Sequence, residues 1–487
     1  METFLLDKES KTILGIIEYL SATSGTAVSF SDLEDNLNIN RATVKRYIQT
    51  LCDYCQEQQL DTFIVHKHTI KMSRDTNFNI FDLYHQMTQK AVKYQIMLHI
   101  FKNPRIIFID LYSDLLMSKT SCYWHVKALN DFFTSYHCQL NFRQKNSVQG
   151  KEYQIRFLYY NLFWGLNLDK IIDDAPNLDQ VLMSLFDFIP NLIYSTLQKI
   201  RLAFYIAQVR QKSGDFIMSE DMFISPDSPY LTYAVFFERL DSSSFLDNCP
   251  DVAIKHKEAR YLYFLFCRFN LLTLDECEDV KLQLSVSDSP EIQYFLTQFQ
   301  DRLPFKLTES ELNFLSTNLV LFNQEAAIFR GRIKAFGEEN WLLRTIRASQ
   351  NTVAFIQTFL HDISEGNREI KNLIQNLPNL YQHYGLLVNT IIEKHHKPIK
   401  LLVQTNLSTL YRENLIVQIM NTVPFPISIC TSEQLNGEKP DGIISDWIPE
   451  KKHQDIPFFS VSLFFTSWNK SELEDFLISL VDYKNQL

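Results

Sequence analysis

Basic and amide side chains recur at helical spacing between residues 41 and 49. With 3.6 residues per turn they fall on one side of a helix, away from the apolar residues between them. Guanidinium, ammonium and amide groups are the donors that contact phosphate oxygens and base edges in the major groove of DNA. We therefore expect this face to bind double-stranded DNA. The expected contact residues are Arg41, Thr43, Lys45, Arg46 and Gln49.

The surrounding sequence, FSDLEDNLNINRATVKRYIQTL (residues 30–51), predicts a helix-turn-helix that would hold this face outward. We expect a short helix, a turn at 38–40, and a second helix that starts at Arg41 with Asn40 as its N-cap. An apolar face on each helix would form a core, with Ile39 in the corner between the two helices. The inward residues are Phe30, Leu33, Leu37, Val44, Ile48 and Leu51.

A further helix and a hairpin complete this first unit. Residues 8–22 repeat apolar side chains at helical spacing and predict a helix that packs behind the helix-turn-helix. Residues 63–72 alternate around a polar turn and predict a two-stranded wing. Its tip would carry Lys67 and two histidines to the phosphates. We therefore predict a winged helix-turn-helix over residues 1–75.

The helix-turn-helix pattern returns 78 residues later. Residues 107–129 align with 29–51 without a gap, and the apolar positions, the cap and the first basic residue all recur. Ser118 takes the place of Asn40 as the N-cap. The alternative to a second DNA reader is a structural or dimerising copy in which Trp124 packs against protein. The contact residues expected for a second reader are Lys119, Thr120, Tyr123 and Lys127.

The neighbouring segments predict the frame of this second unit. Residues 80–102 carry one continuous helical pattern. Two strands, near 139–143 and 152–156, are expected to enclose a polar tip as a second wing. We predict that the second helix-turn-helix domain, also winged, spans residues 76–165.

The rest of the chain divides into helical and mixed parts. Successive amphipathic patterns predict two tandem all-helical bundles, over 166–285 and 286–394. Over 395–487 strands alternate with helices, which predicts a small α/β domain with a mainly parallel sheet. Its last helix is expected to open with the capping box Ser471-x-x-Glu474. The predicted fold class is thus mostly α and multidomain.

The composition is that of a helical protein without membrane spans. Of the 487 residues 46% are hydrophobic and only 11 are Gly, and no uncharged apolar run reaches about 18 residues. The N-terminus lacks the basic and apolar regions of a signal peptide, and the eight Cys are irregularly spaced. We expect reduced thiols, a cytoplasmic location and no membrane contact.

Charge is distributed unevenly along the chain, whose formal net charge is −10. Residues 1–160 hold 18 Lys and Arg against 16 Asp and Glu, whereas the remainder holds 29 against 41. A near-neutral N-terminal third with basic faces, followed by an acidic body, fits a DNA-binding head on a regulatory body. The alternative reading is that this asymmetry is accidental.

The sequence contains no recognisable pattern of a catalytic or cofactor site. It lacks a phosphate-binding Gly-rich loop, a nucleophile elbow and a His-Glu-x-x-His motif. Cys52-x-x-Cys55 followed by His66-x-His68 matches no common zinc-finger spacing, and both Cys lie at the end of an amphipathic helix. We therefore expect no enzymatic activity, no cofactor and no metal.

In the order of its parts the chain resembles the Mga/AtxA family of virulence-type transcriptional regulators from Gram-positive bacteria. Two helix-turn-helix units, at 29–51 and 107–129, precede two helical modules placed like phosphotransferase-system regulation domains (PRDs), and the end is similar to an enzyme IIB. The resemblance implies a homodimer that binds promoter DNA and controls virulence or carbohydrate-use genes. It also implies tuning through histidine phosphorylation by a phosphocarrier protein of the sugar phosphotransferase system.

The helical modules depart from the family pattern. Related regulation domains often carry a phosphorylatable His before an Arg-x-x-x-Gly, and the first bundle keeps Arg210 and Gly214 but lacks that His. We expect no phosphate at the usual positions of this bundle, and possible phosphorylation of His383 and His361 in the second. The positions that lack the expected His are Ala203 or Phe204, and Leu265.

The last domain departs as well. An enzyme IIB of this fold carries a phospho-accepting Cys after its first strand, where loop amides and a helix N-terminus hold the phosphate. Here Gln404 and Thr405 occupy that place, and Cys430 ends a different strand. We expect a domain that keeps the fold, lacks transfer chemistry and serves assembly or partner contact.

Two other functions remain open at this stage. RNA-binding antiterminators also carry regulation domains, but they begin with a small β-rich RNA-binding domain, whereas this chain begins with helices. A pure interaction scaffold would have no affinity for DNA at all.

Overall fold

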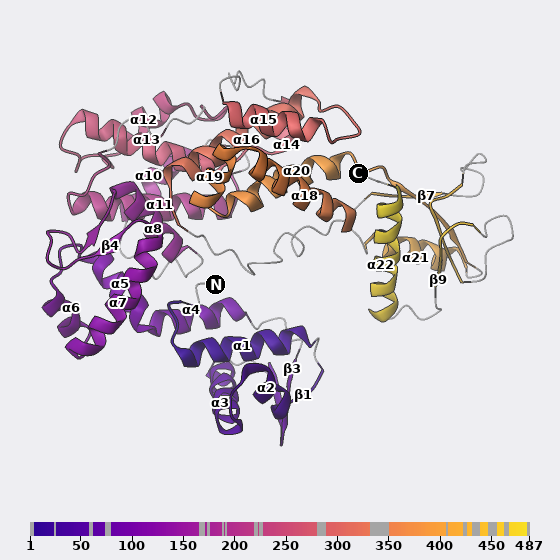
Figure 1. Cartoon of the computed structure of the whole chain (residues 1–487), viewed down its shortest axis with the longest axis horizontal. Coiled ribbons are helices and arrows are strands. Elements are labelled where there is room, and N and C mark those ends of the chain that lie inside the picture. The colour runs from indigo at the N-terminus through magenta and orange to yellow at the C-terminus, as the bar shows by residue number, and fades with distance from the viewer. Residues whose placement is uncertain are drawn as a thin grey trace. The chain divides into compact units, whose positions relative to one another are not determined.

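The chain is mostly helical, with small sheets, and it divides into two compact units (Figure 1). The first unit comprises residues 1–224 and 230–269, and the second comprises 225–229 and 270–487. Among the described residues no helix is both long and apolar enough to cross a membrane. The computed structural model describes residues 4–23, 26–57, 62–73, 79–164, 171–172, 176–187, 189, 192–218, 223, 227–279, 289–331, 350–405, 408–421, 426–430, 439–446, 455–461 and 467–484.

The first unit begins with the predicted helix-turn-helix and its hairpin. The elements are α1 (Lys8–Ala22), β1 (Val28–Ser29), α2 (Phe30–Leu37), α3 (Arg41–Glu57), β2 (Phe63–His66) and β3 (Thr69–Met72). The strands form an antiparallel sheet in the order β1-β3-β2. The helix over 8–22 and the hairpin over 63–72 confirm the sequence prediction, while β1 is a strand that the sequence pattern did not indicate.

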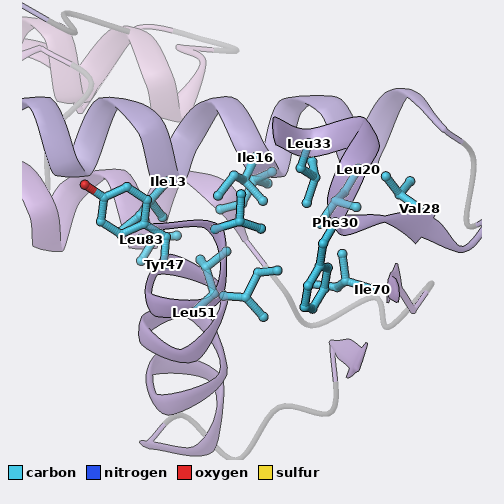
Figure 2. Close-up of a cluster of buried hydrophobic side chains, with 13 residues drawn as sticks. Ile13, Ile16, Leu20, Val28, Phe30, Leu33, Tyr47, Leu51, Ile70 and Leu83 are labelled. Atoms are coloured by element: carbon cyan, nitrogen blue, oxygen red, sulfur yellow. The ribbon is translucent and has the colours of Figure 1, made fainter. Parts of the chain in front are cut away.

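An apolar core holds these elements together (Figure 2). Ile16 and Leu20 of α1 lie near Leu33 and Phe30 of α2 in that view, and all four are at most 3% exposed, whereas Ile13 lies at the other end of the cluster. Each fully buried side chain of this kind stabilises the fold by about 1.5–3 kcal/mol. The core that the periodicity predicted is therefore present, and α1 covers the helix-turn-helix from behind.

The single helix predicted over 80–102 is wrong. The segment forms two helices, α4 (Ile80–Lys90) and α5 (Val92–Lys102), because Ala91 is extended with φ −69° and ψ 129°. Leu83 of α4 packs into the core of the first helix-turn-helix, whereas α5 packs on a helix of the second one. One straight helix cannot serve two separate cores, so tertiary packing overrides the continuous pattern.

The elements that follow the second helix-turn-helix differ from the predicted ones. Its elements are α6 (Phe108–Asp114), α7 (Lys119–Ser135), β4 (Gln139–Leu140), β5 (Val148–Gln149) and α8 (Glu152–Phe163). The hairpin is short, and the strand predicted near 152–156 is wrong because that segment begins α8. Helix α8 is buried almost all round, and an apolar run of this kind does not distinguish strand from helix. The ion pair of Glu152 with Arg156 at i,i+4 fits only the helix.

Four helices complete the described part of the first unit: α10 (Pro176–Phe186), α11 (Tyr194–Lys212), α12 (Tyr233–Ser242) and α13 (Val252–Phe269). Helix α11 packs on α8, α10 and α13. Stacked and edge-on aromatic rings fill the space between these helices, with Phe186 lying 5.1 Å from Phe266 and 6.1 Å from Phe204 between ring centroids. Helix α8 of the second helix-turn-helix domain is thereby part of the same bundle.

The second unit begins with a helical bundle, in agreement with the predicted helical texture. Its described helices are α14 (Leu274–Asp279), α15 (Pro290–Gln300), α16 (Glu309–Ile328), α18 (Gln350–Gly366), α19 (Arg368–Asn376) and α20 (Leu380–Lys394). Thr308 and Glu311 form a capping box at the start of α16, which packs on α20 and α19.

The chain ends in an α/β fold. Its elements are β6 (Ile399–Gln404), α21 (Thr409–Met420), β7 (Ile427–Cys430), β8 (Gly442–Ser445), β9 (Phe458–Ser460) and α22 (Ser467–Lys484). The neighbouring strands are parallel in the order β7-β6-β8-β9, which confirms the predicted sheet. The predicted capping box is wrong: α22 begins at Ser467, so Ser471 lies inside the helix.

Candidate nucleic-acid interface

The first helix-turn-helix is held by side-chain caps on both of its helices. Ser29 and Asp32 form a capping box at the start of α2, in which each backbone N–H donates to the other side chain at 3.1 Å. Asn38 ends α2 in the left-handed conformation with φ 51°. The Thr43 N–H then donates to Asn40 Oδ1 at 2.9 Å, so the predicted N-cap of α3 is confirmed.

The predicted basic face of α3 points to solvent. Arg46 Nη2 donates to the hydroxyl of the buried Tyr47 at 3.1 Å, and its guanidinium carbon lies 4.9 Å from that ring centroid. Arg41 Nε lies 3.9 Å from Glu34 Oε1, and exposed pairs of this kind contribute at most about 1 kcal/mol. Arg41 therefore remains available to a ligand. The residues of this face are Arg41, Lys45, Arg46 and Gln49, all exposed, and the half-buried Thr43.

The hairpin is fixed to the start of α2. The Phe30 N–H donates to the His68 carbonyl oxygen at 2.8 Å, and Val28 pairs with Ile70 across the sheet. Lys67 is exposed at the tip between β2 and β3, where the sequence placed a phosphate contact. The backbone bond and the strand pairing therefore connect the hairpin directly to the start of α2.

The second helix-turn-helix repeats the first in its backbone. Helices α3 and α7 are both 17 residues long, and α7 begins and ends 78 positions after α3. Leu116 has the same φ of 51° as Asn38 at the equivalent position of the turn. The Ser121 N–H donates to Ser118 Oγ at 3.1 Å, as the Thr43 N–H does to Asn40. The predicted inward residues Cys122, Val126 and Leu129 are all buried.

The outward face of α7 is aromatic as well as basic. Trp124 and Tyr123 are 59% and 55% exposed, and their ring centroids lie 5.8 Å apart. Lys127 Nζ lies 5.3 Å from the centroid of the Trp124 ring. Trp124 is thus largely open to solvent in this chain, and packing against protein would require a partner. The residues predicted to contact DNA here are Lys119, Thr120, Tyr123 and Lys127, all exposed.

Buried ion pairs join the second helix-turn-helix domain to the helical bundle. Arg156 of α8 donates to both carboxylate oxygens of Glu258 on α13, at 2.6 and 2.8 Å, and its Nε donates to Glu152 at 2.9 Å. Arg210 of α11 in turn donates to both oxygens of Glu152, at 3.0 and 2.8 Å, and lies 3.0 Å from Asp215. Arg156 and Glu258 are fully buried. We call these five residues the buried ion network.

Two further bonds extend the buried ion network to its surroundings. Asn146 Nδ2, in the segment between β4 and β5, donates to Asp215 Oδ1 at 2.7 Å. The Ile217 N–H donates to Glu258 Oε1 at 2.7 Å. The hairpin of the second domain, its last helix and two bundle helices therefore share one set of hydrogen bonds. A buried ion pair adds little net stability, but removing one partner is strongly destabilising because it leaves a buried charge uncompensated.

The predicted phosphorylation sites have different surroundings. His383 of α20 stacks on Phe322 with ring centroids 4.5 Å apart and planes 7° apart, and it is half-buried. His361 of α18 is exposed. The positions that lack the expected His, Ala203, Phe204 and Leu265, are all buried in the first unit.

The cysteines and the end of β6 provide no reactive thiol in the expected place. Gln404 is the last residue of β6, and Thr405 Oγ1 donates to Asp446 Oδ2 at 2.8 Å. Cys430 is buried at the end of β7. Burial raises the pKa of the thiols of Cys52 and Cys55, which disfavours the thiolate form that zinc binds.

The sequence pattern did not indicate the buried ion network. A signal for the network was present, because Glu152, Arg156 and Arg210 interrupt strongly apolar runs where charge is costly. Their long-range pairing could not be read from the sequence, since Arg210 lies 58 residues from Glu152 and Arg156 lies 102 residues from Glu258.

Comparison with known proteins identifies one part of the chain. Residues 76–163 match the family model of the Mga helix-turn-helix domain. This segment contains α4 to α8, and hence the α6–α7 pair and two residues of the buried ion network. A search of curated proteins found no match to the chain.

Proposed function

The match at residues 76–163 supports membership of the Mga family of regulators, and from this premise we propose that both helix-turn-helix units bind promoter DNA. The match suggests a DNA-binding transcriptional regulator. The observation that supports two reading heads is the repeated backbone, in which α3 and α7 each begin with an exposed basic residue, Arg41 and Lys119, at equivalent positions. Lys45 and Arg46 on α3, and Lys119 and Lys127 on α7, would contact phosphates and base edges.

The wider proposal follows the order of the domains. The two heads act as winged helix-turn-helices, the two bundles as PRD-like modules, and the parallel sheet as an enzyme IIB-like domain that serves assembly. The chain would then be a cytoplasmic homodimer that controls virulence or carbohydrate-metabolism genes. Support for the last domain comes from its strand order β7-β6-β8-β9 and its parallel pairing.

DNA binding is tested with the variant Arg41→Ala/Arg46→Ala in the full-length chain. We expect weaker binding to promoter DNA and a salt dependence whose slope falls by about one per lost phosphate contact. Gel-shift titration across several salt concentrations measures both. The matched control is Lys371→Ala/Arg412→Ala, which removes the same charge from the second unit. Equal binding by both variants would exclude α3 as a reader.

Other outcomes of the same titration separate the alternative functions. If the wild-type chain binds no duplex but binds a structured RNA, the antiterminator reading replaces this proposal. If the chain binds neither duplex DNA nor RNA and still self-associates, the interpretation as an interaction scaffold replaces this proposal.

Tuning by phosphorylation rests on His383 and His361. We propose that the phosphocarrier protein of the sugar phosphotransferase system modifies one of them, with exposed His361 the more accessible and His383 held flat against Phe322. Mass spectrometry without acid steps, after incubation with the phosphotransferase proteins, detects the modification. An unmodified chain beside a phosphorylated control protein would refute it.

A further inference from the structure

Equivalent exposed positions of the two helix-turn-helices carry opposite chemistry. The backbone match at an offset of 78 allows each surface residue to be compared with its counterpart. Lys45 and Arg46 of α3 correspond to Tyr123 and Trp124 of α7. The same change from polar to apolar occurs at three other positions, where Ser29, Ser31 and Asn38 correspond to Ile107, Ile109 and Leu116. The apolar replacements are 50%, 59% and 95% exposed.

Tyr123, Trp124 and Lys127 form one cluster on the outward face of α7, which we call the aromatic cluster. Both rings are more than half exposed and touch edge to face, and the Lys127 ammonium lies beside the Trp124 ring. Neither ring fills the core beneath α7, because Cys122, Val126 and Leu129 do so. Large exposed aromatic side chains grouped in this way mark an interaction surface.

The charge of this surface favours DNA as its occupant. Between Lys119 and Asn130 helix α7 carries two Lys and no acidic residue. In a two-fold contact between copies of the chain the same face would meet itself, which would bring two copies of Lys119 and Lys127 into one interface without an acidic residue of this face to pair with them. A polyanion instead pairs with both Lys residues. Charge complementarity therefore selects DNA over a second copy.

In the major groove thymine alone presents a methyl group beside its O4 acceptor. Apolar side chains contact this methyl, whereas Arg and Gln pair with the polar edges of guanine and adenine. The exposed carbon edges of Trp124 and Tyr123 suit the methyl, and the Tyr123 hydroxyl suits O4. The α3 face, with Arg46 and Gln49 at the equivalent places, suits the polar edges.

We propose that Tyr123 and Trp124 give the second helix-turn-helix its specificity by contacting thymine methyl groups, while α3 reads polar base edges and phosphates. This inference rests on the proposed function, since it assigns a base to one of the two heads. The two helices thus read different sequence features with one shared backbone.

The experiment compares thymine with uracil, which lacks only the methyl group. Duplexes that the full-length chain selects from a random duplex library are remade with deoxyuridine in place of thymidine. Each methyl contact contributes about 0.8 kcal/mol, so each lost contact should weaken wild-type binding about four-fold. The variant Tyr123→Ser/Trp124→Ser should bind both duplexes with equal affinity. Both side chains are exposed, so the substitutions remove no core contact.

The matched control is Lys45→Ser/Arg46→Ser, at the equivalent positions of α3. It should lower affinity for both duplexes and reduce the salt slope, while keeping the preference for thymine over uracil. If Tyr123→Ser/Trp124→Ser retains the preference, or binds DNA as wild type does but loses self-association in sedimentation, the inference is overturned. Wild-type binding that is equal on both duplexes overturns it too and leaves DNA binding intact. A wild-type chain that selects no duplex overturns the proposed function itself.

Discussion

The two helix-turn-helices share a backbone and differ in their outward side chains and in the elements that pack against them. The first, residues 29–57, closes on an apolar core of its own with α1 and the hairpin, and shows solvent a basic and amide face. The second, residues 107–135, shows an aromatic and basic face, and its domain continues into the bundle through the buried ion network. The same helix-turn-helix backbone thus packs against different neighbouring elements in the two copies and presents different side chains to solvent.

This difference shows which positions determine the backbone. The turn conformation, a side-chain N-cap and the burial of most inward positions are retained between the copies, and the second helices, α3 and α7, have the same length. The outward positions have no part in the core and are free to change from Lys45 and Arg46 to Tyr123 and Trp124. Binding chemistry can therefore diverge without a cost to the fold.

The largest effect is expected from a substitution in the buried ion network, which joins the second helix-turn-helix domain to the helical bundle. Glu258→Gln removes the buried carboxylate that accepts from both Nη groups of Arg156 and should destabilise the bundle and the second helix-turn-helix by about 3–5 kcal/mol, because both Nη groups of this fully buried guanidinium then lose the negative charge to which they donate. Hydrogen exchange with mass spectrometry should show faster exchange in α7 and α8 and unchanged exchange in α3. The control is Asp179→Asn, which breaks an exposed pair with Arg201 and should cost less than about 1 kcal/mol. An equal increase of hydrogen exchange in α3 would contradict the conclusion that the two helix-turn-helices are stabilised by separate contacts.

Truncating one core residue of each copy tests how far the copies are equivalent. Leu33 and Leu111 are both 0% exposed at equivalent positions, so Leu33→Ala and Leu111→Ala should each cost about 3 kcal/mol locally. Hydrogen exchange in α3 and α7 reports each effect. A clearly smaller loss for Leu111→Ala would mean that the buried ion network, and not the apolar core, holds the second copy.

Exchanging the turn residues Asn38 and Leu116 between the two copies should change the stabilities of the two helix-turn-helices in opposite directions. Leu116 adopts φ 51°, where Leu is strained and Asn is better tolerated. Leu116→Asn should therefore stabilise the second copy, and Asn38→Leu should destabilise the first, each by about 1 kcal/mol. Urea denaturation followed by exchange protection of α7 and α3 measures the shifts. Changes of the same sign in both variants would show that the two turns are not equivalent.

The smallest expected effect is a pH dependence confined to the second copy. Burial, and then the charge of Lys93, lowers the pKa of His125 below its ordinary value of about 6.5. The unfolded chain then binds the proton more readily, so stability is present above the unfolded pKa and falls as pH drops below about 6.5. The equivalent residue in α3 is Tyr47, and His125→Tyr should remove this acid sensitivity in α7. Exchange protection of α7 between neutral and mildly acidic pH checks it, with α3 as the internal reference.

Several features could be predicted from the sequence because they depend on local rules. The turn of the first copy, its N-cap Asn40 and the inward faces follow from residue type and helical period, and the structure confirms them. The exposure of Arg41, Lys45 and Arg46 follows from the same period. The gapless repeat made the second copy predictable from the first, including the start of α7 at Lys119 with Ser118 as its N-cap.

The failures occur where distant parts of the chain compete for one segment. The helical pattern over 80–102 is continuous, but α4 and α5 pack into separate cores, so the helix breaks at Ala91. The run that begins at Glu152 could be a strand by its apolar content, and its pairing with Arg210 and packing on α11 favour the helix. These outcomes depend on partners that sequence spacing does not reveal.

The sequence by itself determined the two helix-turn-helices, their caps and their outward side chains, because backbone preference and amphipathic period act over a few residues. Only the tertiary structure decided how the second copy is anchored. A buried Arg156 and a buried Glu258 are each unfavourable alone, and they become acceptable only when folding places them within 2.6 Å of each other across 102 residues of chain.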